Sequence, residues 1–230
     1  MGVPHAASAA ECAAERVDGN RYTICRVDVA TDTVRLFLND PETAQPYGSF
    51  SALPDTVQIA MNGGMYHEDR RPVGHYVEDG DTVMRVIPNA GPGNFGLLPN
   101  GVLCLNDGSA RVVETLRYVE EAPACRYATQ SGPMLVIDGE LHPRFLPDSD
   151  SRKRRNGVGM SPDGATLWMA ITDNAVTFHA FGSLFRDHLG ADQALFLDGS
   201  ISRLYIRDDV AGGPRLDGGP RMGPILAVTD

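Results

Sequence analysis

The chain has 230 residues, of which 20 are Lys or Arg and 30 are Asp or Glu, giving a formal net charge of −10 at pH 7. Apolar residues make up 42% and charged residues 22%, so the chain can bury a core and is not expected to be intrinsically disordered. The acidic balance argues against nucleic acid as a partner, because phosphate backbones are bound by clustered Lys and Arg. No apolar stretch approaches the roughly 20 residues of a membrane-spanning helix, so no transmembrane segment is expected.

The N-terminal segment and the cysteines both indicate export. Residues 1–10 end in Ala-Ser-Ala-Ala, which is similar to the end of a secretory signal, although a basic start and an apolar centre are missing. We expect residues 1–20 to be a flexible N-terminus, either a remnant of an export signal or an ordinary tail, and residues 21–230 to form a single domain. Four cysteines allow three pairings and lack the C-x-x-C spacing of zinc or redox sites. One or two structural disulfides, and hence a periplasmic or secreted location, are predicted.

Short strands dominate the expected secondary structure, because β-branched and aromatic runs alternate with Gly, Pro, Asn and Asp. In chain order the predicted strands are residues 22–29, 33–38, 57–61, 74–77, 82–87, 101–105, 110–113, 134–137, 166–171, 194–197, 203–206 and 224–228. The clearest helix begins after Thr177 as N-cap, carries Phe181 and Phe185 on one face, and ends before Gly190. These patterns predict an α+β fold: a single domain rich in antiparallel or mixed β-sheet, with a few packed helices.

Four segments carry the candidate functional residues, because each combines an apolar run with Gly, Asn, Asp or Ser: residues 61–66, 128–134, 154–160 and 195–202. In the first segment, Asn62 offers both a hydrogen-bond donor and an acceptor. Gly63 and Gly64 are expected to allow positive φ and a close approach of backbone N–H groups to a ligand. The alternative for this Asn-Gly pair is an ordinary hairpin turn.

The second and third segments offer polar and cationic groups. Gln130, Ser131 and Gly132 are expected either to bind substrate or to form a turn. Ser131 lacks the G-x-S-x-G elbow of a serine nucleophile, which disfavours a serine hydrolase. Arg155 is the last of four consecutive cationic residues, and its guanidinium suits bidentate contact with phosphate or carboxylate. The alternative for this charge run is a solvated loop.

The fourth segment delivers Asp198 at the end of an apolar strand, followed by Gly199 and Ser200. A carboxylate there is either a turn-capping group or a catalytic acid or base whose pKa burial can tune. No metal or other cofactor is expected. The acidic stretch at residues 148–151 lacks the Gly and Glu that complete a calcium loop.

Taken in order, these segments resemble the phosphodiester glycosidase family. The similar motifs are N-G-G-M-Y at residues 62–66, P-V-G at 72–74, S-G-P-M-L at 131–135, R-N-G-V-G at 155–159 and L-D-G at 197–199. The resemblance covers roughly residues 57–228. It implies hydrolysis of the bond between the anomeric carbon of a sugar and a phosphodiester oxygen, with a glycosyl phosphate or glycan as substrate.

The same resemblance implies a role for each candidate residue. Asp198 is expected to act as nucleophile or base and Arg155 to bind the phosphate, with Asn62 as the third catalytic residue. The expected substrate-binding residues are Gly63, Gly64, Gln130, Ser131, Gly132, Gly199 and Ser200. Candidates for a general acid, if the phosphate leaving group needs one, are Glu68, Asp69, His75 and Asp173.

The loop after Asp198 departs from the family pattern, because Ser200 stands where a further Gly is common. This departure keeps a second function open: a secreted carbohydrate- or anion-binding module that has the same pocket without turnover.

Overall fold

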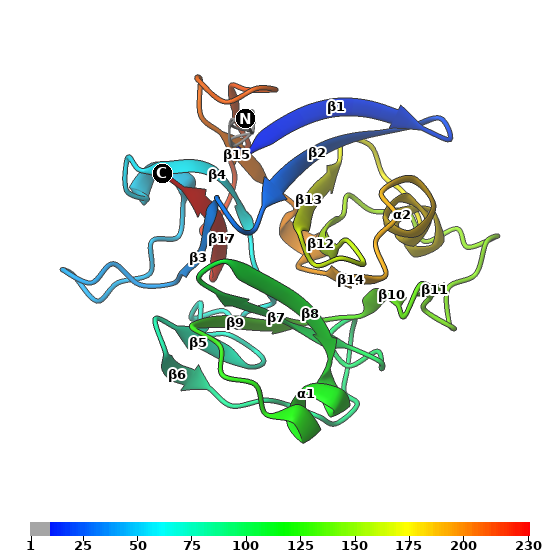
Figure 1. Cartoon of the computed structure of the whole chain (residues 1–230), viewed down its shortest axis with the longest axis horizontal. Coiled ribbons are helices and arrows are strands. Elements are labelled where there is room, and N and C mark those ends of the chain that lie inside the picture. Colours follow the sequence, from blue (N-terminus) through cyan, green and yellow to red (C-terminus); the bar gives the residue numbers. More distant parts are fainter. Residues whose placement is uncertain (1–9) are drawn as a thin grey trace, which may run out of the picture.

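The structure, a computed structural model, describes residues 10–230, which form three antiparallel β-sheets and two short α-helices (Figure 1). The seven-stranded sheet has the order β1-β2-β13-β12-β14-β10-β11. Its strands are β1 (Glu11–Val17), β2 (Asn20–Asp28), β10 (Met134–Ile137), β11 (Glu140–Leu141), β12 (Asn156–Met160), β13 (Thr166–Thr172) and β14 (Gln193–Phe196). The predicted fold class, a single α+β domain rich in antiparallel sheet, is confirmed.

The two other sheets have five strands each. One has the order β16-β15-β4-β17-β3, with β3 (Thr33–Phe37), β4 (Val57–Asn62), β15 (Leu204–Ile206), β16 (Arg215–Leu216) and β17 (Ile225–Thr229). The other has the order β6-β5-β9-β7-β8, with β5 (Tyr76–Glu78), β6 (Asp81–Met84), β7 (Gly101–Asn106), β8 (Ser109–Glu114) and β9 (Tyr127–Ser131). The helices are α1 (Thr115–Glu121) and α2 (Phe178–Ser183).

The main core lies where the three sheets face one another. It combines apolar side chains from each sheet, such as Leu195 of β14, Ile59 of β4 and Leu103 of β7, all fully buried. Alternation along each strand sends every second side chain into this shared core. The sheets therefore hold one another in place, and the strand ends that carry polar residues meet at their junction.

The α2 region covers the outer face of the seven-stranded sheet (Figure 1). Thr177 caps the helix as predicted, because its Oγ1 accepts a hydrogen bond from the backbone N–H of Ala180 at 3.1 Å. The helix continues as a π-helical turn over Leu184–His188, and Gly190 then adopts a left-handed φ of 65°. Phe181 and Phe185 pack onto the sheet, as their spacing predicts.

One or two disulfides were predicted, and the structure contains two. Cys12 of β1 bonds to Cys25, its direct partner across the β1–β2 ladder, and Cys104 of β7 bonds to Cys125. The expectation of a flexible segment over residues 1–20 is wrong from residue 11 onward, because β1 pairs along its whole length with β2. Residues 1–9, which contain most of the suspected export signal, lie outside the described residues.

Two segments that the sequence analysis did not list among the strands are strands. Residues 127–131 form β9 in the middle of a sheet, and residues 156–160 form β12 between β13 and β14. Gly63 and Gly64 do not adopt the positive φ that was expected. A Cβ on Gly64 would lie 2.5 Å from Oγ1 of Thr129, so this glycine is required by close packing rather than by its φ angle.

Candidate functional site

Asn62, the last residue of β4, holds the two ends of the loop that carries Asp198. Its Nδ2 donates to the backbone carbonyl of Asp198 at 3.0 Å, and its Oδ1 accepts from the backbone N–H of Arg203 at 2.9 Å. The side chain of Asn62 is fully buried. One amide group therefore fixes where residues 198–203 leave β14 and enter β15. Two of the three predicted catalytic residues, Asn62 and Asp198, are in direct contact.

Further polar residues support the Asn62 clamp, by which we mean the two hydrogen bonds from the Asn62 amide to residues 198 and 203. The Asn156 amide donates to the carbonyl of Asn62 at 3.0 Å, and its Oδ1 accepts from the hydroxyl of Ser202 at 3.4 Å. From β9, the hydroxyl of Ser131 donates to the carbonyl of Leu197 at 3.1 Å. Both Asn156 and Ser131 are fully buried. Strand ends from all three sheets thus converge on the Asp198 loop. Residues that only formed local turns would not need to meet in this way.

Arg155 lies immediately before β12, and its side chain is 1% exposed. Its Nε donates to the carbonyl of Val176 at 3.0 Å and its Nη2 to the carbonyl of Ser151 at 3.1 Å. The guanidinium also stacks on Phe178, with Cζ 3.6 Å from the ring centroid, and lies 5.7 Å from the ring of Phe196. Burial lowers the pKa of Arg155 to about 10. Because the side chain is almost completely buried, a bidentate contact with substrate would require the segments around Arg155 to move.

Two of the predicted substrate-binding residues, Gly63 and Gln130, use their hydrogen-bonding groups within the protein. The N–H of Gly63 donates to the carbonyl of Pro224 at 2.7 Å. The side-chain oxygen of Gln130 accepts from the backbone N–H groups of His75 and Ile87, both at 3.0 Å, and its amide donates to Ile87 and Thr115. Gln130 therefore holds the β5–β6 region against β9.

Two predicted glycines permit tight packing around the site. A Cβ on Gly132 would lie 2.7 Å from that of Asn100, and a Cβ on Gly199 would lie 2.5 Å from the ring of Phe196. Gly199 begins a short 3-10 turn, Gly199–Ile201, that includes Ser200. Asp198 and Gly199 are half-buried, so the turn lies at the boundary between core and solvent.

Charged residues, Asp198 among them, lie near the phenol of Tyr66. Burial raises the pKa of the Tyr66 phenol, and the negative charge of Asp198 raises this pKa further, whereas the cations Arg70 and Arg203 lower it. Arg70 also lies over the Tyr66 ring, with Cζ 5.4 Å from its centroid. These interactions place Asp198, Arg70 and Arg203 near the same phenol.

A cavity of about 280 Å³ adjoins the Asp198 loop. Its lining residues are Arg154, Gly199, Ile201, Ser202, Arg203, Asp217, Gly218 and Pro220. Of the lining residues, Ser202 lies in the fourth segment but was not named as a site residue, and Arg203 lies four residues after the L-D-G motif, just outside that segment. Their position was visible in the sequence, but Arg203 reads there as the first residue of a strand.

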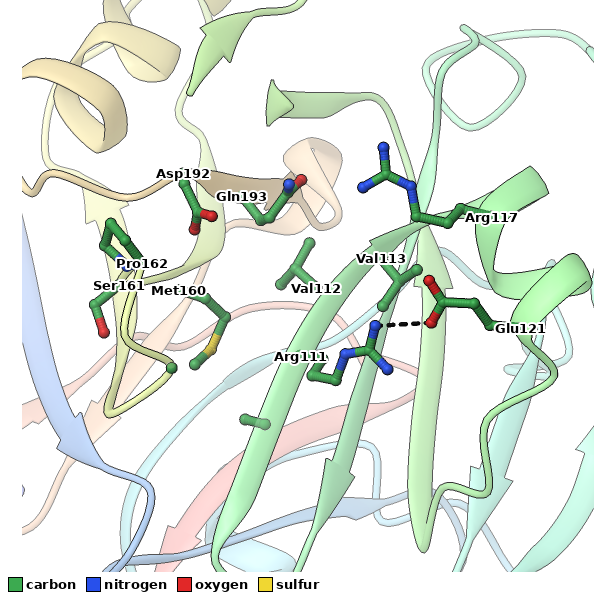
Figure 2. A pocket seen from close by; sticks show the side chains of 12 residues that line it. Arg111, Val112, Val113, Arg117, Glu121, Met160, Ser161, Pro162, Asp192 and Gln193 are labelled. Carbon is green, nitrogen blue, oxygen red and sulfur yellow. Dashed lines mark hydrogen bonds and ion pairs between the residues drawn. The ribbon is translucent and has the colours of Figure 1, made fainter. Parts of the chain in front are cut away.

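A separate cavity of about 240 Å³ lies between β8 and the ends of β12 and β14 (Figure 2). Its arginines are paired: Arg111 with Glu121 at 2.7 Å, and Arg117 with Asp138 at 2.9 Å. None of the predicted site residues lines it. The candidate site is therefore the cavity at the Asp198 loop.

Among the general-acid candidates, Glu68 is exposed, and the other two carboxylates are paired with arginines. Asp69 is exposed and bonds to Arg71, and Asp173 pairs with Arg215 at 2.9 Å. His75 is buried, with its Nδ1 2.8 Å from the carbonyl of Met84. In residues 10–230 no group of three or more His, Cys, Asp or Glu side chains is arranged to hold a metal ion, and no helix there is long and apolar enough to cross a membrane.

Comparisons with known proteins show which sequences this chain is similar to. Residues 55–222 match the family model described as phosphodiester glycosidase. The uncharacterized protein YigE of Escherichia coli (strain K12) is 32% identical over 200 residues, which cover 80% of this chain and 78% of that protein. The chain belongs to the phosphodiester glycosidase family. The match includes Asn62, Arg155, Asp198 and Arg203, so the site lies within the family's shared region.

Solved structures show that the fold is shared as well. The catalytic domain of zebrafish N-acetylglucosamine-1-phosphodiester alpha-N-acetylglucosaminidase, auto-inhibited by its pro-peptide, superposes with a TM-score of 0.65 at 13% identity, covering 96% of this chain and 82% of that one. A protein of Synechocystis superposes with a TM-score of 0.65 at 14% identity, covering 95% of this chain and 61% of that one. At these identities the likeness concerns the fold alone.

Proposed function

We propose that this phosphodiester glycosidase family member hydrolyses glycosyl phosphodiesters, with Asp198 as the carboxylate that acts as nucleophile or base. The observation that supports this most is the convergence of Asn62, Asn156 and Ser131 on the Asp198 loop, beside a cavity lined by arginines. Such an arrangement anchors the backbone of Asp198 next to a place for an anion, and the reaction needs a fixed carboxylate beside an anion site.

In this reaction the bond between the anomeric carbon and the phosphodiester oxygen breaks. Its electron pair leaves on the phosphate, and water, either directly or after attack by Asp198, supplies the new hydroxyl. The products are a reducing sugar and a phosphomonoester. A negative carboxylate near the anomeric carbon stabilises the positive charge that develops there or forms a bond to it.

The other predicted residues take different proposed roles. Asn62 fixes the loop ends and so positions Asp198. Arg155 lies beneath the loop, near Phe196, and contributes positive charge and rigidity. The Gly199–Ile201 turn, with Ser200, is proposed to face the sugar. Since both disulfides require an oxidising compartment, we also propose a periplasmic or secreted location.

The test uses 4-nitrophenyl phosphodiesters of several hexose 1-phosphates in ¹⁸O-labelled water. Cleavage at the anomeric carbon places ¹⁸O on the sugar and releases 4-nitrophenyl phosphate. Asp198→Asn should lower kcat by about a thousandfold or more while substrate binding largely survives, because only the charge is lost. The exposed Asp208→Asn is the matched control and should behave as the parent.

Three results would contradict the proposal. Label on the phosphate with release of nitrophenol would indicate a phosphodiesterase. Near-parental turnover by Asp198→Asn would remove Asp198 from the mechanism. Saturable binding of these compounds without any turnover would favour the non-catalytic binding module.

A further inference from the structure

The cavity beside the Asp198 loop carries two arginines that the sequence motifs do not include in the site. Arg154 and Arg203 line it together with a single carboxylate, that of Asp217. The formal charge of its lining is therefore +1, in a chain whose net charge is −10. A local positive excess on an acidic protein is a feature that attracts a small anion.

Arg203 is held in a position that the surrounding loop is shaped to accept. The residue is 5% exposed, its backbone N–H is bound by Asn62, and its Nη2 donates to the carbonyl of Pro220. A Cβ on Gly219 would lie 2.5 Å from Nη2 and 2.7 Å from Cζ of Arg203. The guanidinium thus packs against Gly219, and a larger residue at this position would displace it.

The carboxylate of Asp217 is already engaged by cations. Arg154 reaches it at 3.2 Å and Arg215 at 3.0 Å, and it also accepts from the backbone N–H of Leu204 at 3.2 Å. Arg215 in turn pairs with Asp173 at 2.9 Å. With Arg215 and Asp173 included, the cluster has three cations and two anions, so the positive excess remains.

We propose that Arg203, assisted by Arg154, contacts the phosphoryl oxygens of the substrate and makes the site selective for glycosyl phosphates over neutral glycosides. This inference rests on the proposed function and assigns to these two residues the direct contact that the sequence motifs assign to Arg155. Guanidinium groups match the geometry of phosphate oxygens and bind them by charge-assisted hydrogen bonds. Burial lowers the pKa of Arg203, and a bound anion would offset that desolvation.

The first measurement is calorimetric binding of inorganic phosphate to the full chain, which needs no turnover. Arg203→Gln should weaken binding by about ten- to a hundredfold, the range expected for a lost hydrogen bond to a charged group. Arg154→Gln should weaken it less, because Arg154 is exposed and partly neutralised by Asp217. Arg152→Gln, an exposed arginine in the same segment that does not line the cavity, should bind phosphate as the parent does.

Two further variants separate charge from position. Arg203→Lys keeps the charge and should restore part of the binding. Gly219→Ala keeps the arginine but displaces its guanidinium and also strains the backbone at a φ of 142°, so it should weaken binding, with thermal unfolding used to verify that each variant is folded. Sulfate should compete with phosphate and chloride should not, because the proposed contacts recognise a tetrahedral oxyanion.

Activity provides the second measurement. The preference of kcat/KM for a glycosyl phosphodiester over the 4-nitrophenyl glycoside of the same sugar should shrink in Arg203→Gln. Phosphate binding that is absent in the parent, or unchanged in folded Arg203→Gln, overturns the inference. Phosphate binding that depends on Arg203 in a protein that cleaves no glycosyl phosphodiester would leave the subsite in place and refute the proposed function instead.

Discussion

At the scale of single residues, the chain uses buried polar side chains to hold backbone in place. Asn62 and Asn156 are fully buried and bond mainly to carbonyl and N–H groups of other segments. A buried amide with a missing partner costs about 1–3 kcal/mol, so these contacts specify one arrangement of the site. Arg155 belongs to the same class, because carbonyl groups and an aromatic ring surround its charge.

Arg155→Lys should therefore affect stability as well as activity. Lysine keeps the charge but cannot reproduce both the Nε bond to Val176 and the Nη2 bond to Ser151, and it loses the planar stack on Phe178. We expect the free energy of unfolding, measured in urea, to fall by about 1–3 kcal/mol. Arg152→Lys is the exposed control. Unchanged stability with lost phosphate binding would instead support the direct phosphate contact that the sequence suggests for Arg155.

The sequence singled out Asn62 and Asp198 as candidates but could not show which of their atoms make contacts. An Asn amide can form hydrogen bonds with a ligand or with backbone groups of the protein. Asn62 bonds to the backbone because the fold places β4 beside the loop of residues 198–203. Arg203 was missed for the same reason: its chemistry depends on Gly219 and Pro220, which are sixteen and seventeen residues later in the chain.

At the scale of elements, two strands were hidden by their composition. The glycines of β12 suggest a loop, but they allow close packing: a Cβ on Gly157 would lie 2.7 Å from the carbonyl of Leu195, and one on Gly159 would lie 2.6 Å from the Phe185 ring. The polar residues of β9 suggest a turn, yet Gln130 and Ser131 are satisfied inside the fold. Both strands depend on contacts with elements that are distant in the sequence, and a local sequence pattern does not show these contacts.

The β1 edge strand offers an element-scale prediction. Within residues 10–230, β2 is the one strand that pairs with it, and the Cys12–Cys25 disulfide ties the two strands together over a separation of 13 residues. The double variant Cys12→Ser and Cys25→Ser should lower the free energy of unfolding by about 2–4 kcal/mol. Hydrogen exchange should show loss of protection in β1 before the rest of the seven-stranded sheet. Equal stability of this variant and the parent would contradict a structural role for the bond.

At the scale of the whole molecule, three sheets depend on a common core, so a local protonation event can affect global stability. His75 lies immediately before β5, next to Tyr118. Its Nδ1 donates to the Met84 carbonyl at 2.8 Å, so its Nε2 accepts from the Tyr118 hydroxyl at 3.0 Å. Burial lowers the pKa of His75 in the folded state. The neutral imidazole is therefore the form that the fold requires.

This arrangement predicts a pH dependence of unfolding. Because the unfolded chain takes up the proton first, the contribution of His75 is fully present above the unfolded pKa of about 6.5 and is lost as pH falls below it. His75→Gln can keep both hydrogen bonds without titrating. The drop in Tm between pH 7.5 and pH 5.5 should be smaller for this variant than for the parent, and parallel curves would contradict the assignment.

The clamp formed by Asn62 also bears on how the family can diversify. It grips the carbonyl of residue 198 and the amide N–H of residue 203, which are groups that nearly every amino acid possesses. The anchor is therefore indifferent to the side chains between its two ends. Gly199 is held by its packing against Phe196 and Ser202 by its bond to Asn156, so positions 200 and 201 are the ones that an engineer or natural evolution can exchange to change what the loop recognises while its attachment points stay where they are.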